Sequence, residues 1–260
     1  MKAKTERAEK RRKFLREIGG IVLGVLIALG LGAIATEIGW LIDVHYANKA
    51  IGEELGEIIG QGQERIRVYP CVERKLTAIG GILNEADKTG KLPPVGDIGN
   101  PAWRTWSHNV WDSTIGSDTA SHFDRKTLDN ISGVYEFVTL VSHFSEDEAD
   151  SWRRLYAIVG SGRPIDRQEV VALRDALSSA RVDNRMMAAS SVRMTQIVDA
   201  FDLPVNLDTV RQYGNVPIDR YCGPIGRPDG SDYGEGTMRG MVERVERNPI
   251  TKDSIGVVKK

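Results

Sequence analysis

The sequence predicts an all-α protein with a single N-terminal transmembrane helix, a helical-bundle domain and an irregular C-terminal tail. Three observations support this fold class. A run of 19 uncharged residues, Ile18–Thr36, is long enough to cross a bilayer. Behind it, apolar residues recur at spacings of three and four, which is typical of helices. No stretch shows the alternation of apolar and polar residues that marks a half-buried strand.

Charge is unevenly distributed along the 260-residue chain. The formal net charge is −1, but residues 1–42 carry +4 and the rest of the chain carries −5. A mildly acidic body argues against nucleic acid as a partner. The apolar and charged fractions, 41% and 27%, are ordinary for a globular protein and exclude a disordered or polytopic membrane protein.

The apolar run is interpreted as a membrane anchor, residues 18–42, behind a basic tail, residues 1–17. At about 1.5 Å per residue the uncharged run reaches about 28 Å, close to the thickness of a bilayer's hydrocarbon core. Glu37 then falls at the far interface, and aromatic residues flank the run at Phe14 and Trp40. The positive-inside rule therefore predicts a cytoplasmic N-terminus and an extracytoplasmic domain.

Two other interpretations of the run stay open. A buried helix of a soluble protein can be equally apolar. A cleaved signal peptide has the same order of basic and apolar regions, and Ala33-Ile34-Ala35 matches the pattern for cleavage after Ala35. The apolar run is longer than the ~7–15 residues of a signal peptide and continues past that point, which favours an anchor.

Small residues recur at every fourth position of the anchor. The resulting ridge consists of Gly20, Gly24, Ala28, Gly32 and Thr36. Such ridges let membrane helices approach closely, so we expect the anchor to associate with itself or with another membrane protein. The spacing repeats at Gly52, Gly56 and Gly60 in a predicted helical stalk, residues 43–68. Because each glycine weakens a helix by about 1 kcal/mol, we expect the stalk to lean on a partner.

Residues 69–225 are predicted to form the helical domain, with a helix break at Tyr69-Pro70. The Pro- and Gly-rich segment 90–101 is expected to be a loop, and a Trp-rich helix is expected to follow it. Farther on, Ser145 and Glu148 have the spacing of a capping box, which predicts the start of a new helix.

The strongest helical pattern lies between Asp166 and Pro204. It predicts one helix of about 35 residues with Asp166 as its N-cap. Its period of 3.5 is typical of left-handed packing against neighbouring helices. The stripe is interrupted at Ala180, Asn184 and Ser191. These interruptions favour an intramolecular bundle over a free coiled coil. The Gly-rich tail, residues 226–260, is predicted to be mostly irregular.

The chain has two cysteines, Cys71 and Cys222. Outside the cytoplasm such a pair predicts a disulfide, and two buried thiols are the alternative. The bond would close a loop of about 150 residues and would stabilise the fold by about 5 kcal/mol at most.

No motif predicts a reaction. His108 and Asp112 have a spacing that places two ligands on one helix face, but no HExxH motif accompanies them. The sequence contains neither a G-x-S-x-G elbow nor a Walker loop. We therefore predict no catalytic residue, metal or cofactor. The clustered tryptophans Trp103, Trp106 and Trp111 are expected either to pack in a core or to line a pocket.

The segment FLREI (residues 14–18) followed by IVLGVLIALG (residues 21–30) resembles a broad group of uncharacterised bacterial single-pass membrane proteins. Their spans have an E-I-x-x-I-V-L-G-V-L-I-A-L pattern and precede a helical domain. The resemblance implies an anchor in the bacterial inner membrane with a periplasmic domain, and it implies no activity.

Two functions are expected from these observations. The first is a non-enzymatic interaction or scaffold protein, held in the bilayer and forming a component or accessory of a membrane complex. The alternative is a periplasmic ligand-binding or sensor module whose pocket is lined by Trp103, Trp106 and Trp111.

Overall fold

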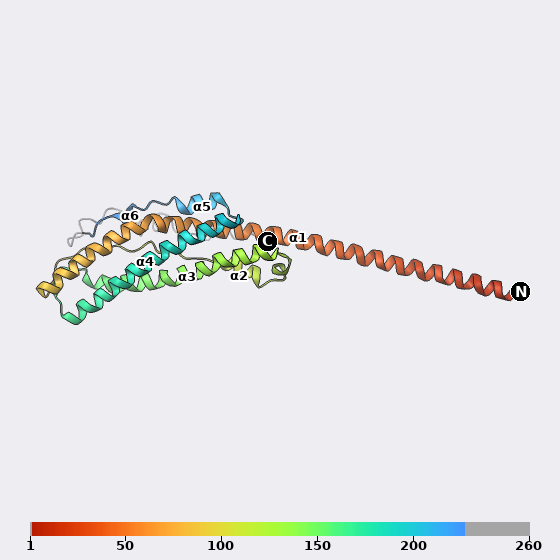
Figure 1. Ribbon diagram of the computed structural model, residues 1–260, viewed down its shortest axis with the longest axis horizontal. Helices are drawn as coiled ribbons and strands as arrows, with labels where there is room; N and C mark the ends of the chain where they lie inside the picture. Colours follow the sequence, from red (N-terminus) through yellow and green to blue (C-terminus); the bar gives the residue numbers. More distant parts are fainter. Residues whose placement is uncertain (1, 227–260) are drawn as a thin grey trace, which may run out of the picture.

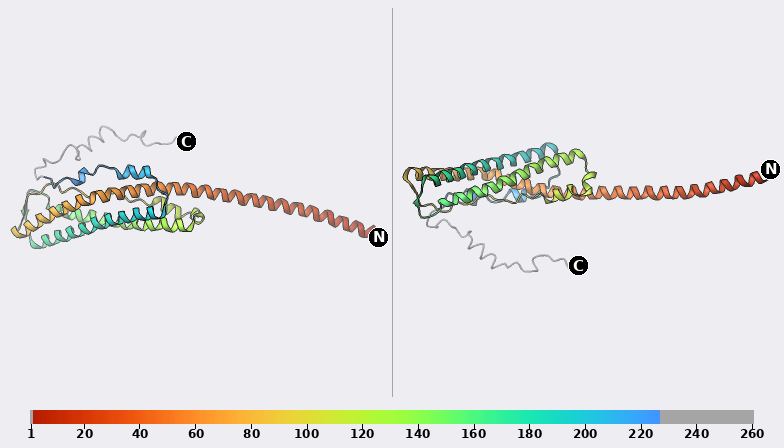
Figure 2. Two further views of the ribbon diagram at one scale, coloured as in Figure 1. Left: turned by 45° about the horizontal axis from the view of Figure 1, so that its top comes forward. Right: turned by 90° about the horizontal axis from the view of Figure 1, so that it is seen from below.

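The computed structural model describes residues 2–226, so the prediction for the tail beyond them lies outside the described residues. The fold is all-α, as predicted. Figure 1 shows one very long helix, α1 (Lys2–Thr89), whose N-terminal part projects alone from a helical bundle. The two views in Figure 2 confirm that nothing else in the described chain lies along this projecting part.

Three long helices build the bundle. The C-terminal half of α1 packs along α4 (Arg167–Phe201), and α4 in turn packs along α3 (Arg125–Leu155). Shorter elements complete it: α2 (Asn109–Ile115), the 3₁₀ helices η1 (Asp118–His122) and η2 (Tyr156–Ile158), α5 (Leu207–Gly214), α6 (Asp219–Cys222), and the antiparallel strands β1 (Lys91–Leu92) and β2 (Arg163–Pro164). α3 runs parallel to α1 because the connection after β1 returns along the bundle, whereas α4 is antiparallel to both.

The prediction for α4 is confirmed. The helix has 35 residues, and the side chain of its N-cap, Asp166, accepts a hydrogen bond from the backbone N–H of Glu169 at 2.8 Å. The helix ends at Phe201, and the left-handed backbone of its C-cap, Asp202 (φ 48°), turns the chain before Pro204. Local signals at both ends therefore define this element.

Two predicted helix boundaries are wrong. α1 passes through Tyr69-Pro70 without a break. An internal proline costs a helix about 3 kcal/mol, but Val68 and Val72 on either side are fully buried, so packing outweighs this local cost. Ser145 and Glu148 do not begin a helix either, since both are buried within the continuous helix α3.

Two further predictions are corrected. Residues 43–68 do not form a separate stalk, because Ile51, Leu55 and Ile58 are completely buried in the bundle. The Trp-rich segment is not one helix, because α2 begins only at Asn109 and the first two of its tryptophans precede it.

The apolar interior consists of two clusters along the bundle axis. The proximal core lies near the point where α1 leaves the bundle. It contains Ile51, Leu55, Ile58 and Ile59 of α1 together with Ile131, Val138, Met187 and Met194. The distal core contains Val72, Leu76, Ile79 and Leu83 of α1 together with Trp152, Leu155, Leu173 and Leu177. Between them the interior is polar.

The glycine ridge of the predicted stalk does have a close partner, and it is α5 of the same chain. A Cβ atom on Gly56 would lie 2.7 Å from the carbonyl oxygen of Asn206, and one on Gly60 would lie 2.8 Å from that of Val210. At Gly52 the backbones meet directly, since its carbonyl accepts a hydrogen bond from the N–H of Asn206 at 2.9 Å.

This contact gives a testable prediction. Gly60→Ala is expected to lower the free energy of unfolding by about 1–3 kcal/mol, because its methyl group must displace the backbone of α5. Gly81→Ala, on an open face of the same helix, should instead raise it by up to about 1 kcal/mol through helix propensity. Chemical unfolding of the full-length protein in detergent compares the two variants, and equal effects would contradict the α1–α5 packing.

Candidate functional site

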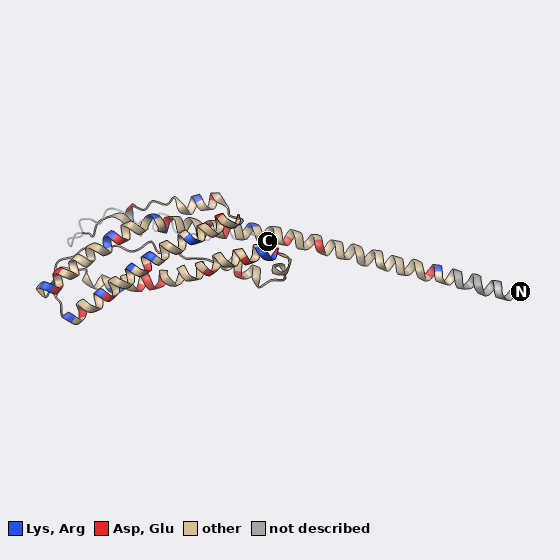
Figure 3. Cartoon of the chain, viewed as in Figure 1, with Lys and Arg blue, Asp and Glu red and all other residues tan. Residues whose placement is uncertain are grey.

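The projecting part of α1 has the length and composition of a membrane span. Its most apolar window has a mean hydropathy of 2.5 and is not buried by any described part of the chain. Figure 3 shows that this stretch is free of charged residues until the approach to the bundle. A core helix of a soluble protein would be covered, so the structure favours the membrane interpretation over that alternative.

The ridge on the span is uncovered. Cβ atoms placed on Gly20, Gly24 or Gly32 would meet nothing within 4 Å. The hydroxyl of Thr36 donates to the carbonyl of Gly32 at 3.0 Å, so its only described hydrogen bond stays within the helix. Unlike the ridge at Gly52–Gly60, this ridge therefore has no partner in the described chain.

A buried polar layer separates the two cores. The guanidinium of Arg65 on α1 forms an ion pair with Glu148 on α3, and its Nη2 donates to Oδ1 of Asn184 on α4 at 2.9 Å. The Arg65 and Glu148 side chains are 1% and 2% exposed. Burial raises the pKa of Glu148, and the charge of Arg65 opposes this shift. Each long helix thus contributes one member of the layer.

Arg65 and Glu148 were not among the residues predicted to be functional, although the sequence contains a signal for a buried polar layer. Arg65 lies seven residues after Ile58 and seven before Val72, so it occupies a core position of α1. Glu148 continues the buried stripe of α3 between Val141 and Leu155 in the same way. A charged residue in register with an apolar stripe indicates a buried ion pair.

Asp183 lies at the edge of the layer and lines a cavity of about 380 Å³ between α3 and α4. Its Oδ2 has no hydrogen-bond partner among the described residues, and neither does the hydroxyl of Ser151, which lines the same cavity from α3. Burial, with the nearby charge of Asp147, raises the pKa of Asp183 to about 6, and Arg65 opposes the shift.

The shift predicts a pH dependence of stability. Between the ordinary pKa of 3.8 and about 6, the folded protein holds a proton that the unfolded chain has lost. Stability should therefore fall as the pH rises through this window. Asp183→Asn is expected to stabilise the protein at pH 7.5 by about 1 kcal/mol, since the open cavity screens the charge, and to lose that advantage near pH 4. Unfolding curves at both pH values test this, and a pH-independent difference would contradict it.

Glu54 holds α2 in place from the interior of the proximal core. Its carboxylate accepts hydrogen bonds from the backbone N–H groups of Val110 and Trp111 at 3.0 and 3.1 Å, and from the hydroxyl of Tyr135 at 2.6 Å. Burial and the neighbouring carboxylate raise the pKa of Tyr135. Glu54 supplies the cap that His108, at the N-cap position of α2, does not provide.

The three candidate pocket tryptophans are in different environments. Trp106 and Trp111 are buried in the proximal core, where Trp111 stacks on Tyr135 with ring centroids 5.0 Å apart. Trp103 is 58% exposed. Trp111 also lines a cavity of about 200 Å³, together with the predicted pair His108 and Asp112. In that pair, Nδ1 of His108 lies 2.7 Å from Oδ2 of Asp112. No group of acidic, His or Cys side chains suited to a metal ion is found within residues 14–226 as described.

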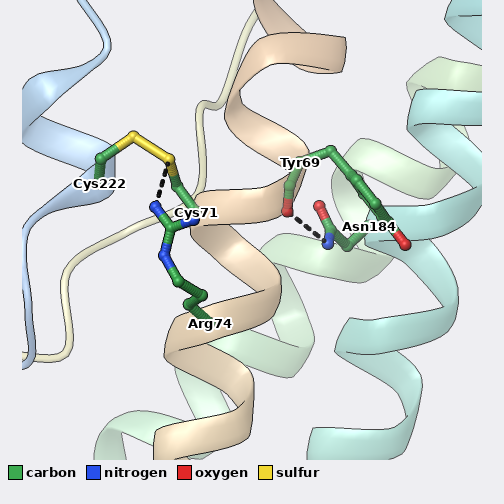
Figure 4. The surroundings of a disulfide bond; sticks show 5 residues. All are labelled: Tyr69, Cys71, Arg74, Asn184 and Cys222. Carbon is green, nitrogen blue, oxygen red and sulfur yellow. Dashed lines mark hydrogen bonds between the residues drawn. A yellow bond between two sulfur atoms is a disulfide. The ribbon is translucent and has the colours of Figure 1, made fainter.

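The predicted disulfide is confirmed. Cys71 on α1 is bonded to Cys222 in α6, and Figure 4 shows the bond joining the two segments. The guanidinium of Arg74 lies 3.3 Å from the sulfur of Cys71. On the opposite side of α1, the carbonyl of Tyr69 accepts a long hydrogen bond from Nδ2 of Asn184 at 3.4 Å. The disulfide and the polar layer therefore contact the same stretch of α1, between Arg65 and Cys71.

Comparison with protein-family models, curated proteins and solved structures finds no match to this chain.

Proposed function

We propose that this protein is a membrane-anchored scaffold or interaction protein whose helical domain acts outside the cytoplasm as part of a membrane complex. The observation that carries the proposal is the continuity of α1. One uninterrupted helix forms both the candidate span and a core element of the bundle, up to Thr89. Such a helix couples the domain rigidly to its anchor, as a scaffold requires.

The proposed location is the bacterial inner membrane, with residues 1–17 in the cytoplasm and the domain in the periplasm. The disulfide supports an oxidising compartment, and the basic residues before the span support this orientation. Cleavage after Ala35 would release a domain with no anchor, so a mass measurement on the mature protein tests this part of the proposal.

The proposed partner of the span is a second copy of it or another membrane protein, docked on the ridge from Gly20 to Thr36. The ridge is uncovered in the monomer, whereas the glycine ridge nearer the bundle is already filled by α5. We include neither a catalytic activity nor a nucleic-acid partner in the proposal, because the sequence contains no catalytic motif and the chain beyond residue 42 is acidic.

A membrane two-hybrid assay tests the partner. Gly24→Leu/Ala28→Leu is expected to weaken association of the full-length chain about tenfold, because the larger side chains separate the helices. Gly30→Leu/Ala33→Leu makes the same two exchanges on the other side of the helix and is the matched control. Equal association of the two double variants would remove the ridge from the proposal.

The cavity at Trp111 favours one alternative, a ligand-binding or sensor module. Under this alternative, a small-molecule fraction of periplasmic extract should change the tryptophan fluorescence of the full-length protein. Trp111→Phe should abolish that change, whereas Trp103→Phe, at an exposed position, should retain it.

A further inference from the structure

One contact links the bundle to the outer end of the span. The indole of Trp40 on α1 stacks on the imidazole of His122 in η1, with ring centroids 4.1 Å apart and planes 13° from parallel. Other residues of α1 and η1 also lie close to one another. The segment formed by α2 and η1 is therefore fixed to the helix at the level of Trp40, and Figure 1 shows it at the end of the bundle from which α1 projects.

This contact determines how far the segment stands from the hydrocarbon core of a bilayer. Trp40 lies four residues beyond Thr36, which is about 6 Å along a helix. A bilayer of about 40–45 Å with a hydrocarbon core of about 30 Å has a headgroup layer of about 5–7 Å on each side. If the helix is tilted, Trp40 lies still closer to the hydrocarbon core. The segment is thus too close to the core for a water layer to separate them.

The side chains of this segment suit a headgroup layer. Ile115, at the end of α2, is 46% exposed. His122 is also exposed, and the cations Arg125 and Lys126 follow at the start of α3, beside the exposed carboxylates of Asp118 and Asp124. Cations bind lipid phosphate oxygens, and an isolated apolar side chain can enter the boundary with the acyl chains.

We propose that this membrane-proximal edge, Ile115–Lys126, lies in the headgroup layer of the outer leaflet and binds lipid phosphates through Arg125 and Lys126. The inference rests on the proposed membrane anchor and adds a second lipid contact from a part of the chain remote in sequence. The edge and the Trp40–His122 stack hold the domain upright on the bilayer.

Fluorescence quenching in nanodiscs tests the proposal with the full-length protein. Single cysteines replace Ile38 at the end of the span, Ile115 in the edge, or Ser178 on α4, and each is labelled while the native disulfide stays oxidised. Ser178 lines the same cavity as Gly80, which lies 44 residues beyond Thr36 and therefore about 65 Å along the helix. The quencher is a phospholipid with a nitroxide headgroup.

We expect the label at Ile115 to lose fluorescence within about twofold of the loss at Ile38, and the label at Ser178 to be unaffected. Quenching at Ile38 without quenching at Ile115 overturns the headgroup contact and leaves the anchor intact. Absence of quenching at all three positions overturns the anchor itself. Equal quenching at all three shows a domain lying flat on the bilayer and overturns the upright arrangement.

Discussion

Glu148→Leu is expected to lower the free energy of unfolding by about 3–5 kcal/mol. The substitution leaves the guanidinium of Arg65 buried between two apolar cores, with Asn184 as its remaining hydrogen-bond acceptor in the layer. A buried cation without its counterion carries the full cost of desolvation, which the volume of the new leucine does not offset. Urea unfolding of the full-length protein in detergent measures the change.

The double variant Arg65→Met/Glu148→Leu is the informative comparison. Removing both charges also removes both desolvation costs, so its stability should return to within about 1 kcal/mol of the original protein. Arg153→Ala is the control at an exposed position, where it breaks the ion pair with Asp150. It should lower the free energy of unfolding by less than about 1 kcal/mol. If the double variant is as unstable as Glu148→Leu, the layer stabilises the fold by something other than charge pairing.

The second large effect is expected from the disulfide. Cys71→Ser/Cys222→Ser should lower the free energy of unfolding by up to about 5 kcal/mol, because the bond closes a loop with a sequence separation of 151. For a domain of this size such a loss corresponds to a fall in Tm of about 10–20 °C. Thermal unfolding by circular dichroism measures it.

The reduced form of the original protein provides the control for this prediction. It has the same side chains at Cys71 and Cys222, so its Tm should fall with that of the double variant if loss of the cross-link is the cause. A Tm within about 2 °C of the oxidised protein would show that the bond restrains only the segment around α6. In that case the buried ring of Tyr221 would become exposed without unfolding the bundle.

The sequence was sufficient for the elements whose determinants are local. α4 begins at a capping aspartate and ends before a proline, and both signals lie within a few residues of the boundary. The Cys71–Cys222 pair followed from the predicted compartment and from the absence of any other cysteine. The glycine spacing at Gly52–Gly60 indicated a close helix partner running from the membrane to the stalk, whereas the structure places α5 of the same chain against it.

The errors arose where distant residues overrule a local signal. Pro70 and the Ser145/Glu148 pair are ordinary helix boundaries when read alone, but burial on both sides keeps their helices continuous. Glu54 had no local signal at all, because the backbone groups that it caps lie more than 50 residues away. The spacing of the glycines indicates that a partner approaches closely, but it does not indicate which element the partner is. For this reason α5 could not be identified from the sequence as the partner.

Because α1 is continuous, the far end of the bundle lies at a fixed distance from the end of the span. In the proposed orientation Thr89 stands 53 residues beyond Thr36, which corresponds to about 80 Å of helix. The turn at Gly90 and the β1–β2 pair are therefore presented at a set distance from the bilayer, without a flexible linker between them. Any partner of the far end of the bundle must therefore lie at this distance from the bilayer. In this way α1 sets the height of the contact as well as anchoring the protein.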